Sequence, residues 1–231
     1  MNEISENVKR VFGRISESAI KAGKRSEEIT LVAAAKMNGA ERVREAIAAG
    51  ISDIGENRVQ ELIGKKAQDA YLGARLHFIG TLQRNKVRNV VGTCGLIQSV
   101  NSRRLMSEIS EYAETHGIVQ DILIEVNVGG EESKSGIEPE KLDELLSAAG
   151  TEKGIYVKGL MTIPPISASS LESRCYYDIM YKLFVDIRAK KYDNVGMKFL
   201  SMGMSGDYAE AILSGADMVR VGTAIFGARR Y

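Results

Sequence analysis

Residue types on which many functional sites depend are scarce in this chain. Its 231 residues include two histidines, two cysteines, three prolines and no tryptophan. A metal centre built from His and Cys is therefore disfavoured, because such centres need three or four of these ligands at close spacing. Cys94 and Cys175 lie far apart in sequence. This spacing predicts two free thiols in a reducing compartment and not a disulfide framework.

The chain also lacks a long apolar run and an excess of one charge. No stretch approaches the ~18 apolar residues that a membrane-spanning helix needs. The acidic start, residues 1–7, lacks the apolar core of a secretory signal. Thirty-one Lys and Arg against 30 Asp and Glu leave a net charge of +1, which gives no reason to expect nucleic-acid binding. These absences predict a cytoplasmic protein that binds neither membranes nor nucleic acid.

Apolar, strand-like runs alternate with amphipathic, helix-like segments along the chain. The predicted strands are 29–36, 51–57, 75–80, 95–100, 121–128, 156–163, 198–204 and 217–221. The predicted helices are 3–23, 40–49, 59–70, a short one ending near 91, 102–116, 139–149, 169–190 and 205–213. About eight such units predict one domain, residues 1–231, folded as a TIM-type (β/α)8 barrel. The helix at 3–23 is an extra N-terminal element, placed across the closed end or the flank of the barrel. An open doubly wound sheet is the alternative, because strand order cannot be deduced from sequence.

The first predicted strand ends on a lysine. The run Ile29-Thr-Leu-Val-Ala-Ala-Ala-Lys36 is typical of a strand buried on both faces. An amine at the point where such a strand leaves the core is partly desolvated. Desolvation disfavours the ammonium form and favours the free amine, which attacks aldehydes. The structural alternative is a lysine that only ends the strand in solvent.

In a barrel of this type, phosphate groups bind in the loops after strands seven and eight. Small hydroxyl residues and glycines are frequent in these loops. The residues there are Ser201, Met202, Gly203, Met204, Ser205 and Gly206 after strand seven, and Gly222 and Thr223 after strand eight. Backbone N–H groups can approach a phosphate closely there, hydroxyls can donate to it, and helix N-termini favour the anion. The structural alternative is that Ser205 caps a helix and Gly222 turns the chain.

Arg220 interrupts the apolar run of the eighth strand, where a buried arginine needs a partner. It either pairs with an acid such as Asp217 or Glu125, or points at a ring nitrogen or an anion. An amine, a phosphate site and a cation together suit an aldehyde that carries a phosphate, and pyridoxal 5′-phosphate has both groups. Arg220 opposite the pyridine nitrogen would keep that nitrogen unprotonated and the ring a weaker electron sink.

Six segments, spread in order over nearly the whole chain, carry a family resemblance. They are Gly55–Asn57, His77–Lys86, Lys134–Gly136, Gly159–Met161, Leu200–Ser205 and Arg220–Gly227. Together they resemble the pyridoxal phosphate homeostasis protein family. The resemblance implies a single barrel, similar to the N-terminal domain of alanine racemase. It implies a protein that binds pyridoxal phosphate and has no established enzymatic activity. It also implies a role in keeping pyridoxal phosphate, and the amino- and keto-acid pools, in balance.

The resemblance also implies roles for individual residues. By position, Lys36 matches the lysine that forms the Schiff base, and Arg220 matches the partner of the ring nitrogen. Part of the phosphate site is matched by Ser201, Gly222 and Thr223, while Asn57 and Met202 are expected to line the pocket. Members of the family usually have Ser before the lysine and Thr or Lys after it, with proline nearby. Here Ala35, Met37, Asn38 and Gly39 stand instead, which predicts fewer polar neighbours for Lys36.

Other polar residues receive structural interpretations. We expect His77 to be a satisfied structural histidine and Glu56 to be an exposed loop acid. The small basic cluster of Arg84, Lys86 and Arg88 is expected on a solvated helix face. Lys134, in its Gly- and Ser-rich loop, is left unassigned.

Three functions compete at this point. The first is a non-catalytic, homeostatic protein that holds pyridoxal phosphate on Lys36 and releases it, with apo-enzymes that depend on this cofactor as partners. The second is a racemase-like enzyme, which needs a second proton donor. In alanine racemase this donor is a tyrosine of an added β-domain, which reaches across a dimer. This chain ends at Tyr231, just after the predicted barrel. We therefore expect the first function and a monomer. The third is a barrel enzyme for sugar or indole phosphates.

Overall fold

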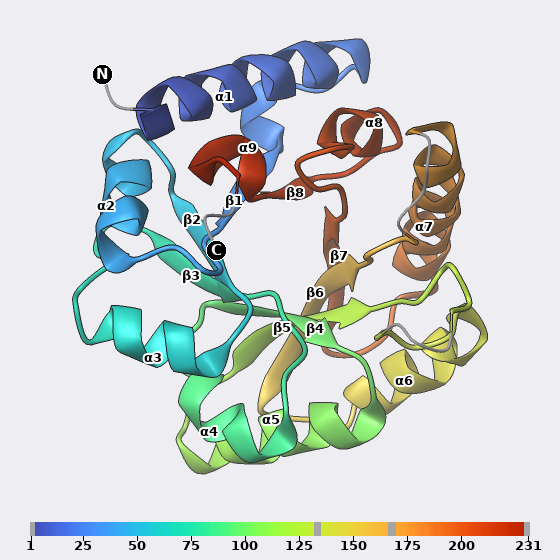
Figure 1. Cartoon of the computed structure of the whole chain (residues 1–231). Helices are drawn as coiled ribbons and strands as arrows, with labels where there is room; N and C mark the ends of the chain where they lie inside the picture. Colours follow the sequence, from blue (N-terminus) through green and yellow to red (C-terminus); the bar gives the residue numbers. More distant parts are fainter. Residues whose placement is uncertain (1–2, 132–134, 166–169, 229–231) are drawn as a thin grey trace.

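Eight parallel strands close into a barrel in the computed structural model, which describes residues 3–131, 135–165 and 170–228. The strands follow one another around the barrel in sequence order, and β8 pairs with β1 (Figure 1). The predicted (β/α)8 barrel is therefore confirmed. A doubly wound sheet would have two open edges, so that alternative is wrong.

Each predicted strand has a counterpart in the barrel. The strands are β1 (Thr30–Ala34), β2 (Asp53–Glu56), β3 (Arg75–Phe78), β4 (Leu96–Val100), β5 (Gln120–Glu125), β6 (Ile155–Met161), β7 (Val195–Ser201) and β8 (Met218–Val221). The α-helices are α1 (Glu3–Lys21), α2 (Ala40–Ala48), α3 (Val59–Lys66), α4 (Val87–Val90), α5 (Arg103–Thr115), α6 (Leu142–Ala149), α7 (Ser170–Lys190), α8 (Tyr208–Leu213) and α9 (Thr223–Phe226). Short 3₁₀ turns are η1 (Ser26–Glu28), η2 (Arg84–Lys86) and η3 (Pro139–Lys141).

Several boundaries differ from the prediction. β1 ends at Ala34, so Lys36 lies two residues beyond the strand, and β7 begins at Val195 instead of 198. Helix α8 begins at Tyr208, whereas the loop from 205 to 207 was expected to open it. The short helix α9 was not predicted, because its apolar sequence reads equally well as the end of a strand.

The strands bury both faces. Side chains that point into the barrel form a small apolar cluster of Val32, Ala34, Ile79, Leu96, Leu123, Met161 and Met218. Side chains that point outward join the larger cluster between the barrel and its helices. Because side chains alternate along a strand, apolar residues at consecutive positions fill both cores, which explains the nearly continuous apolar runs.

Helix α1 lies on the flank of the barrel, beside α2, α8 and α9 (Figure 1). Its buried face includes Ile4, Val8, Val11 and Ile15, and the side-chain amide of Asn7 donates to the carbonyl oxygen of Ile225 at 2.9 Å. Because α9 has only four residues, α1 covers the surface that a longer eighth helix would cover. Among the described residues, no helix is long and apolar enough to cross a membrane.

Candidate functional site

A cavity of about 370 Å³ opens at the carboxyl ends of β1 and β8, and Lys36, Gly222 and Thr223 line it. The register of the barrel explains why residues nearly 190 positions apart meet here: Ala33 pairs with Val221, so both strands leave the barrel at the same level. The backbone of Gly222 lies close to β1, since a Cβ atom on it would be 3.2 Å from the carbonyl oxygen of Ala34. Three of the seven predicted site residues therefore share one cavity.

Lys36 is partly buried and begins a tight turn. The next residue, Met37, has a φ of 61°, a left-handed conformation that side chains with a Cβ rarely adopt. The turn is closed by the N–H of Asn38, which donates to the carbonyl oxygen of Ala35 at 3.1 Å, while the Asn38 side chain donates to the Lys36 carbonyl oxygen at 3.1 Å. Backbone strain of this kind persists where the surrounding structure holds the residue in place.

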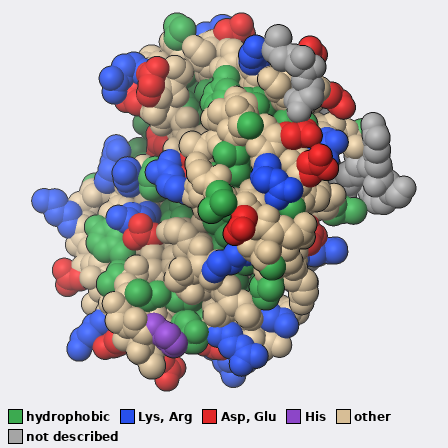
Figure 2. Space-filling model, turned by 90° about the vertical axis from the view of Figure 1, so that its left-hand side faces the viewer, with side chains coloured by type: hydrophobic (Ala, Val, Ile, Leu, Met, Phe, Trp, Pro, Cys, Tyr) green, Lys and Arg blue, Asp and Glu red, His purple; other side chains and the backbone are tan. Residues whose placement is uncertain are grey.

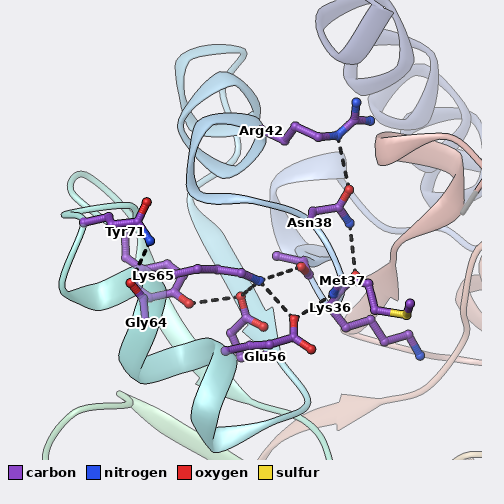
Figure 3. A network of polar contacts seen from close by, with 11 residues as sticks. Lys36, Met37, Asn38, Arg42, Glu56, Gly64, Lys65 and Tyr71 are labelled. Carbon is purple, nitrogen blue, oxygen red and sulfur yellow. Dashed lines mark hydrogen bonds and ion pairs between the residues drawn. The ribbon is translucent and has the colours of Figure 1, made fainter. Parts of the chain in front are cut away.

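A second lysine, Lys65, bonds the backbone at the start of this turn. The ammonium group of Lys65, on α3, donates to the carbonyl oxygen of Ala35 at 2.8 Å and to Glu56 at 2.7 Å. It also reaches Glu61 at 3.3 Å, and the Glu61 carboxylate accepts from the N–H of Met37 at 2.7 Å. Figure 3 shows the Lys36 side chain pointing away from this cluster. Lys65 therefore fixes the backbone of the turn, and the side chain of Lys36 lines the cavity.

The prediction for Glu56 was wrong. Glu56 is the last residue of β2 and its side chain is fully buried, not exposed in a loop. Burial raises the pKa of this carboxyl, and the hydrogen bond and charge of Lys65 oppose that increase. Tyr71 also donates to Glu56 at 3.0 Å. The acid therefore belongs to the support beneath Lys36 and has no access to solvent.

Other polar groups hold the backbone around Lys36, while the expectation of fewer polar neighbours for its side chain stays a prediction. The polar groups come from other elements instead of from the adjacent sequence: Glu61 and Lys65 from α3, and Arg42 from α2. The Arg42 guanidinium donates to the Asn38 side chain at 3.2 Å and to the carbonyl oxygen of Phe226. The turn at Lys36 is thereby tied to α9, on the other side of the cavity.

Arg220 is 4% exposed and points into the barrel interior. Its guanidinium donates to the hydroxyl of Ser201 at 2.6 Å and to the carbonyl oxygen of Thr162 at 2.8 Å. Burial lowers the pKa of Arg220, and the neighbouring Tyr177, Glu125 and Asp207 oppose that effect. In the described part of the chain, no ion pair includes Arg220.

Neither acid suggested as a structural partner pairs with Arg220. Asp217 pairs with Lys24 at 2.8 Å, and Glu125 accepts from the hydroxyl of Ser135 at 2.8 Å. A buried guanidinium whose hydrogen bonds go to neutral oxygens keeps its full charge for another group. This arrangement favours the functional interpretation of Arg220 over the structural one.

The loops after β7 and β8 are joined by Ser205. Its hydroxyl oxygen accepts from the N–H group of Gly222 at 3.1 Å and from that of Ala224, in the first turn of α9, at 3.3 Å. Ser205 therefore caps α9, as the structural alternative allows, and does not cap α8. Gly203 bends the β7 loop with a φ of 92°, and its carbonyl oxygen accepts from the N–H of Arg220 at 3.0 Å. The two loops predicted to bind phosphate therefore form one unit.

The remaining predicted residues lie near the cavity without forming its wall. Ser201 is fully buried against Arg220, and the side chain of Met202 packs into the large core cluster, so only its backbone faces the loops. Asn57 follows β2 directly, and Gly80 packs so closely on its backbone that any side chain at position 80 would overlap it. The side-chain oxygen of Asn57 is buried without a hydrogen-bond donor from the described residues.

The structure also places the residues outside the predicted site. His77 is buried and bonded through both ring nitrogens, which confirms the satisfied histidine. Arg84 and Arg88 are exposed and Lys86 is partly exposed, as expected of a solvated face. Side chains of both charges are interspersed over the face in Figure 2. Lys134 lies outside the described residues.

Sequence reasoning missed Glu61, Lys65 and Ser205 as supports of the site. Glu61 and Lys65 are four residues apart on one helix, a spacing that places them on the same face. That signal exists in the sequence, but only the fold shows that this face lies against the turn at Lys36. Ser205 was noticed as a loop residue, yet its link to Gly222 crosses between two loops and leaves no local pattern.

Comparison with known proteins gives one consistent family. The family model described as the alanine racemase N-terminal domain matches residues 14–230. A pyridoxal phosphate homeostasis protein from Aquifex aeolicus is 42% identical over 226 residues, which cover 98% of each chain. A protein of the same name from Pseudomonas aeruginosa is 39% identical and covers 100% of this chain and 98% of its own length.

A solved structure provides a second line of similarity. PipY from Synechococcus elongatus, with pyridoxal phosphate bound, has 31% sequence identity and a TM-score of 0.81. The match covers 92% of this chain and 100% of that one. The same barrel and a related sequence therefore occur together in a protein whose structure contains this cofactor.

Proposed function

This chain belongs to the pyridoxal phosphate homeostasis proteins, which have the fold of the alanine racemase N-terminal domain, and we propose that it binds pyridoxal 5′-phosphate through Lys36 and takes part in keeping that cofactor in balance. The observation that carries the proposal is the shared cavity of Lys36, Gly222 and Thr223, beside a buried arginine that has no carboxylate partner among the described residues. We take residues 1–231 as one cofactor-binding domain.

The residues present fit the cofactor. Lys36 supplies an amine for the aldehyde, and Thr223 and the Ser205 hydroxyl supply donors for the phosphate, while Gly222, which has no Cβ, lets the backbone approach it. The unpaired buried oxygen of Asn57 is an acceptor of the kind that the ring hydroxyl of pyridoxal needs. The fully buried Ser201 bonds Arg220, and Met202 follows it directly at the end of β7, so both support the site from outside the wall of the cavity.

Each residue acts through binding and orientation. When bound, the cofactor supplies an aldehyde that joins reversibly to the Lys36 amine as a Schiff base. The turn at Met37 and the anchor from Lys65 fix the direction of the Lys36 side chain. Arg220, a permanent cation, would lie opposite the ring nitrogen and would disfavour a proton on that nitrogen. The bound ring is then a weak electron sink, which suits holding the cofactor more than chemistry on amino acids.

A racemase-like enzyme is the second candidate, because the fold is that of a racemase domain. Two-base racemisation needs a proton donor on the ring face opposite the lysine. Among the described residues that line the cavity, the ionisable side chains are Glu3, Lys36 and Arg42, and none is a tyrosine, histidine or cysteine. Glu3 is the carboxylic acid among them, so a racemase-like reaction in this cavity would need Glu3 as that donor.

Absorption spectroscopy tests the proposal. Purified protein incubated with pyridoxal phosphate is expected to develop a visible band, which borohydride reduction converts to a stable adduct. Peptide mass spectrometry is expected to find the adduct on Lys36, and Lys36→Ala should lose the band while Lys66→Ala, an exposed lysine on α3, keeps it. An unmodified Lys36 in protein that binds no cofactor would overturn the proposal.

Chiral analysis separates the two candidate functions. The loaded protein is incubated with a panel of L-amino acids, and the products are resolved by enantiomer. We expect no D-isomers above the level given by free pyridoxal phosphate. Rapid formation of a D-isomer that depends on Lys36 would favour the racemase-like enzyme.

The cellular setting is part of the same proposal. We place the protein in the cytoplasm as a monomer, where apo-enzymes that need pyridoxal phosphate would receive the cofactor. Cys94 and Cys175 are both free thiols, which supports a reducing compartment. Gel filtration of a mixture of the loaded protein and such an apo-enzyme would show whether the cofactor transfers through a complex.

A further inference from the structure

A chain of buried side chains crosses the barrel interior from Arg220 to the opposite mouth. The Arg220 guanidinium donates to the Ser201 hydroxyl, and Ser201 donates to the side-chain oxygen of Gln98 at 2.7 Å. The Gln98 amide nitrogen lies 3.0 Å from Nδ1 of His77. Nε2 of His77 lies 3.0 Å from Asp53, at the start of β2. These five side chains come from β8, β7, β4, β3 and β2, and each is at most 5% exposed.

The ends of this chain and the amide of Gln98 together give its direction. A guanidinium can only donate hydrogen bonds and a carboxylate can only accept them, so Ser201 accepts from Arg220 and Nε2 of His77 donates to Asp53. The middle links follow from the Gln98 amide, whose oxygen faces Ser201 and whose nitrogen faces Nδ1 of His77. The second N–H of the Gln98 amide points at the sulfur of Met218, 3.1 Å away, which agrees with that orientation.

The direction of the chain determines the protonation of His77. Since Nδ1 accepts from Gln98, it carries no proton, and Nε2 must carry the proton that is donated to Asp53. Asp53 is held in turn by Arg75 at 2.9 Å and by the Ser52 hydroxyl at 2.6 Å. The carboxylate is therefore a fixed acceptor, and it orients every group back to Arg220.

We propose that Gln98 and His77 are positioning residues for the cofactor, which hold the Ser201 hydroxyl as a fixed acceptor and thereby hold Arg220 in place. Neither residue lines the cavity at Lys36, and both lie farther along the chain than Ser201, which is the one of these side chains that bonds Arg220. A buried polar network in which every member is satisfied is rigid, and one broken link leaves several buried groups unpaired. Loss of Gln98 would leave Ser201 without its acceptor and His77 without its donor, and Arg220 would lose its fixed partner.

Nitrogen NMR of the cofactor-free protein tests the direction of the chain. The sequence has two histidines, His77 and the exposed His116, so a His116→Gln variant assigns both signals. We expect the ring nitrogens of His77 to show a neutral ring protonated at Nε2. In Gln98→Leu, the Nδ1 signal should move because its donor is gone. A proton on Nδ1 in the unmodified protein would overturn the proposed chain.

Cofactor affinity tests the positioning role, with a matched variant as control. Gln120 is also a buried glutamine on a barrel strand, but its bonds go to the backbone of Gly92 and Cys94 and lie outside this chain. We expect Gln98→Leu to weaken pyridoxal phosphate binding about tenfold, the scale of one lost hydrogen bond, and to shift its visible band. Gln120→Leu should leave both unchanged. Equal effects of the two variants would contradict the positioning role.

A pair of variants at His77 keeps the test decisive if Gln98→Leu does not fold. A glutamine side chain can accept from Gln98 and donate to Asp53, whereas leucine can do neither. His77→Gln should therefore retain most of the affinity that His77→Leu loses, and equal affinities would contradict the role of His77. This role rests on the proposed function. If the unmodified protein bound no pyridoxal phosphate, the proposed function would be refuted. The NMR result would still decide the direction of the hydrogen bonds.

Discussion

The carbonyl oxygen of Ala35 accepts a 2.8 Å hydrogen bond from Nζ of Lys65, so the backbone before Lys36 is held by a lysine from the next helix but one. The same ammonium group pairs with the fully buried Glu56. One side chain thus satisfies a buried charge and also fixes the start of the turn that directs Lys36.

Replacing Lys65 with methionine should therefore destabilise the protein strongly. Methionine keeps the length and apolar contacts of the side chain but leaves the Glu56 carboxylate buried without its cation. Removing one partner of a buried ion pair costs about 3–5 kcal/mol. We expect a loss of this size in the free energy of unfolding, measured by urea titration with circular dichroism.

The neighbouring lysine provides the control for this change. Lys66 is exposed and, among the described residues, its ammonium group bonds the hydroxyl of Thr93. Lys66→Met should therefore change the free energy of unfolding by less than about 0.5 kcal/mol. The double variant Glu56→Gln/Lys65→Met removes the unpaired charge and should recover part of the loss. Equal unfolding midpoints for Lys65→Met and Lys66→Met would show that the buried pair does not support the turn.

The strained residue after Lys36 makes a second prediction. Met37 has a φ of 61° and its side chain is 53% exposed, so little packing is lost when the side chain is removed. Left-handed backbone costs a residue with a Cβ about 1–2 kcal/mol, and glycine avoids that cost. We expect Met37→Gly to stabilise the protein by up to about 1 kcal/mol, since the greater freedom of glycine in the unfolded chain offsets part of the gain.

A β-branched residue at the same position should have the opposite effect. Met37→Val places a branched side chain in the left-handed region and should lower the thermal midpoint relative to Met37→Gly. Thermal melts of the three proteins, followed by circular dichroism, measure the order. If valine and glycine at position 37 gave the same midpoint, the turn would not be strained.

The barrel could be predicted from sequence because each strand and helix has its own hydrophobic period. Lys36, Gly222 and Thr223 were found because the carboxyl ends of barrel strands always meet at one mouth. The burial of Glu56 could not be found in the same way, since it depends on Lys65 reaching back from α3. The chain from Arg220 to Asp53 depends on which side chains of five strands point inward at matching levels, and that follows only from the closed register.

The other end of the barrel predicts a dependence of stability on pH. Burial alone would raise the pKa of Asp53, but hydrogen bonds from His77, Arg75 and Ser52 outweigh it and lower the pKa from 3.8 to about 2. A pKa lowered by folding stabilises the protein above the ordinary value, and this contribution is lost as pH falls through the folded value. The stabilisation by Asp53 should therefore be complete above about pH 4 and disappear toward pH 2.

Urea unfolding of Asp53→Asn at several pH values measures this contribution. At pH 7 the variant should be less stable than the unmodified protein by about 1–2 kcal/mol, and the difference should shrink between about pH 4 and pH 2. Asp143→Asn is the control: Asp143 also has a lowered pKa, from Lys190 and Tyr192, but its side chain is exposed and its contribution is small. A difference at Asp53 that stayed constant down to pH 2 would contradict the lowered pKa.

The hydroxyl of Ser205, which joins the β7 and β8 loops, makes the last prediction. It accepts from the N–H groups of Gly222 and Ala224, and both loops are proposed to bind the cofactor phosphate. Ser205→Ala should weaken the binding of pyridoxal phosphate about tenfold, because two amides lose their acceptor and the phosphate loses a donor. Pyridoxal, which has no phosphate, should bind both proteins equally.

Titrations of pyridoxal phosphate and pyridoxal, followed by the visible band, give the two affinities. Ser214→Ala serves as the matched control. Ser214 is a buried serine directly after α8, and its hydroxyl donates to Asp178, away from the two loops. It should leave the preference for pyridoxal phosphate over pyridoxal unchanged. Only the phosphate distinguishes the two ligands. If Ser205→Ala lost affinity for both ligands to the same extent, Ser205 would therefore act on the Lys36 side of the cavity and not at the phosphate.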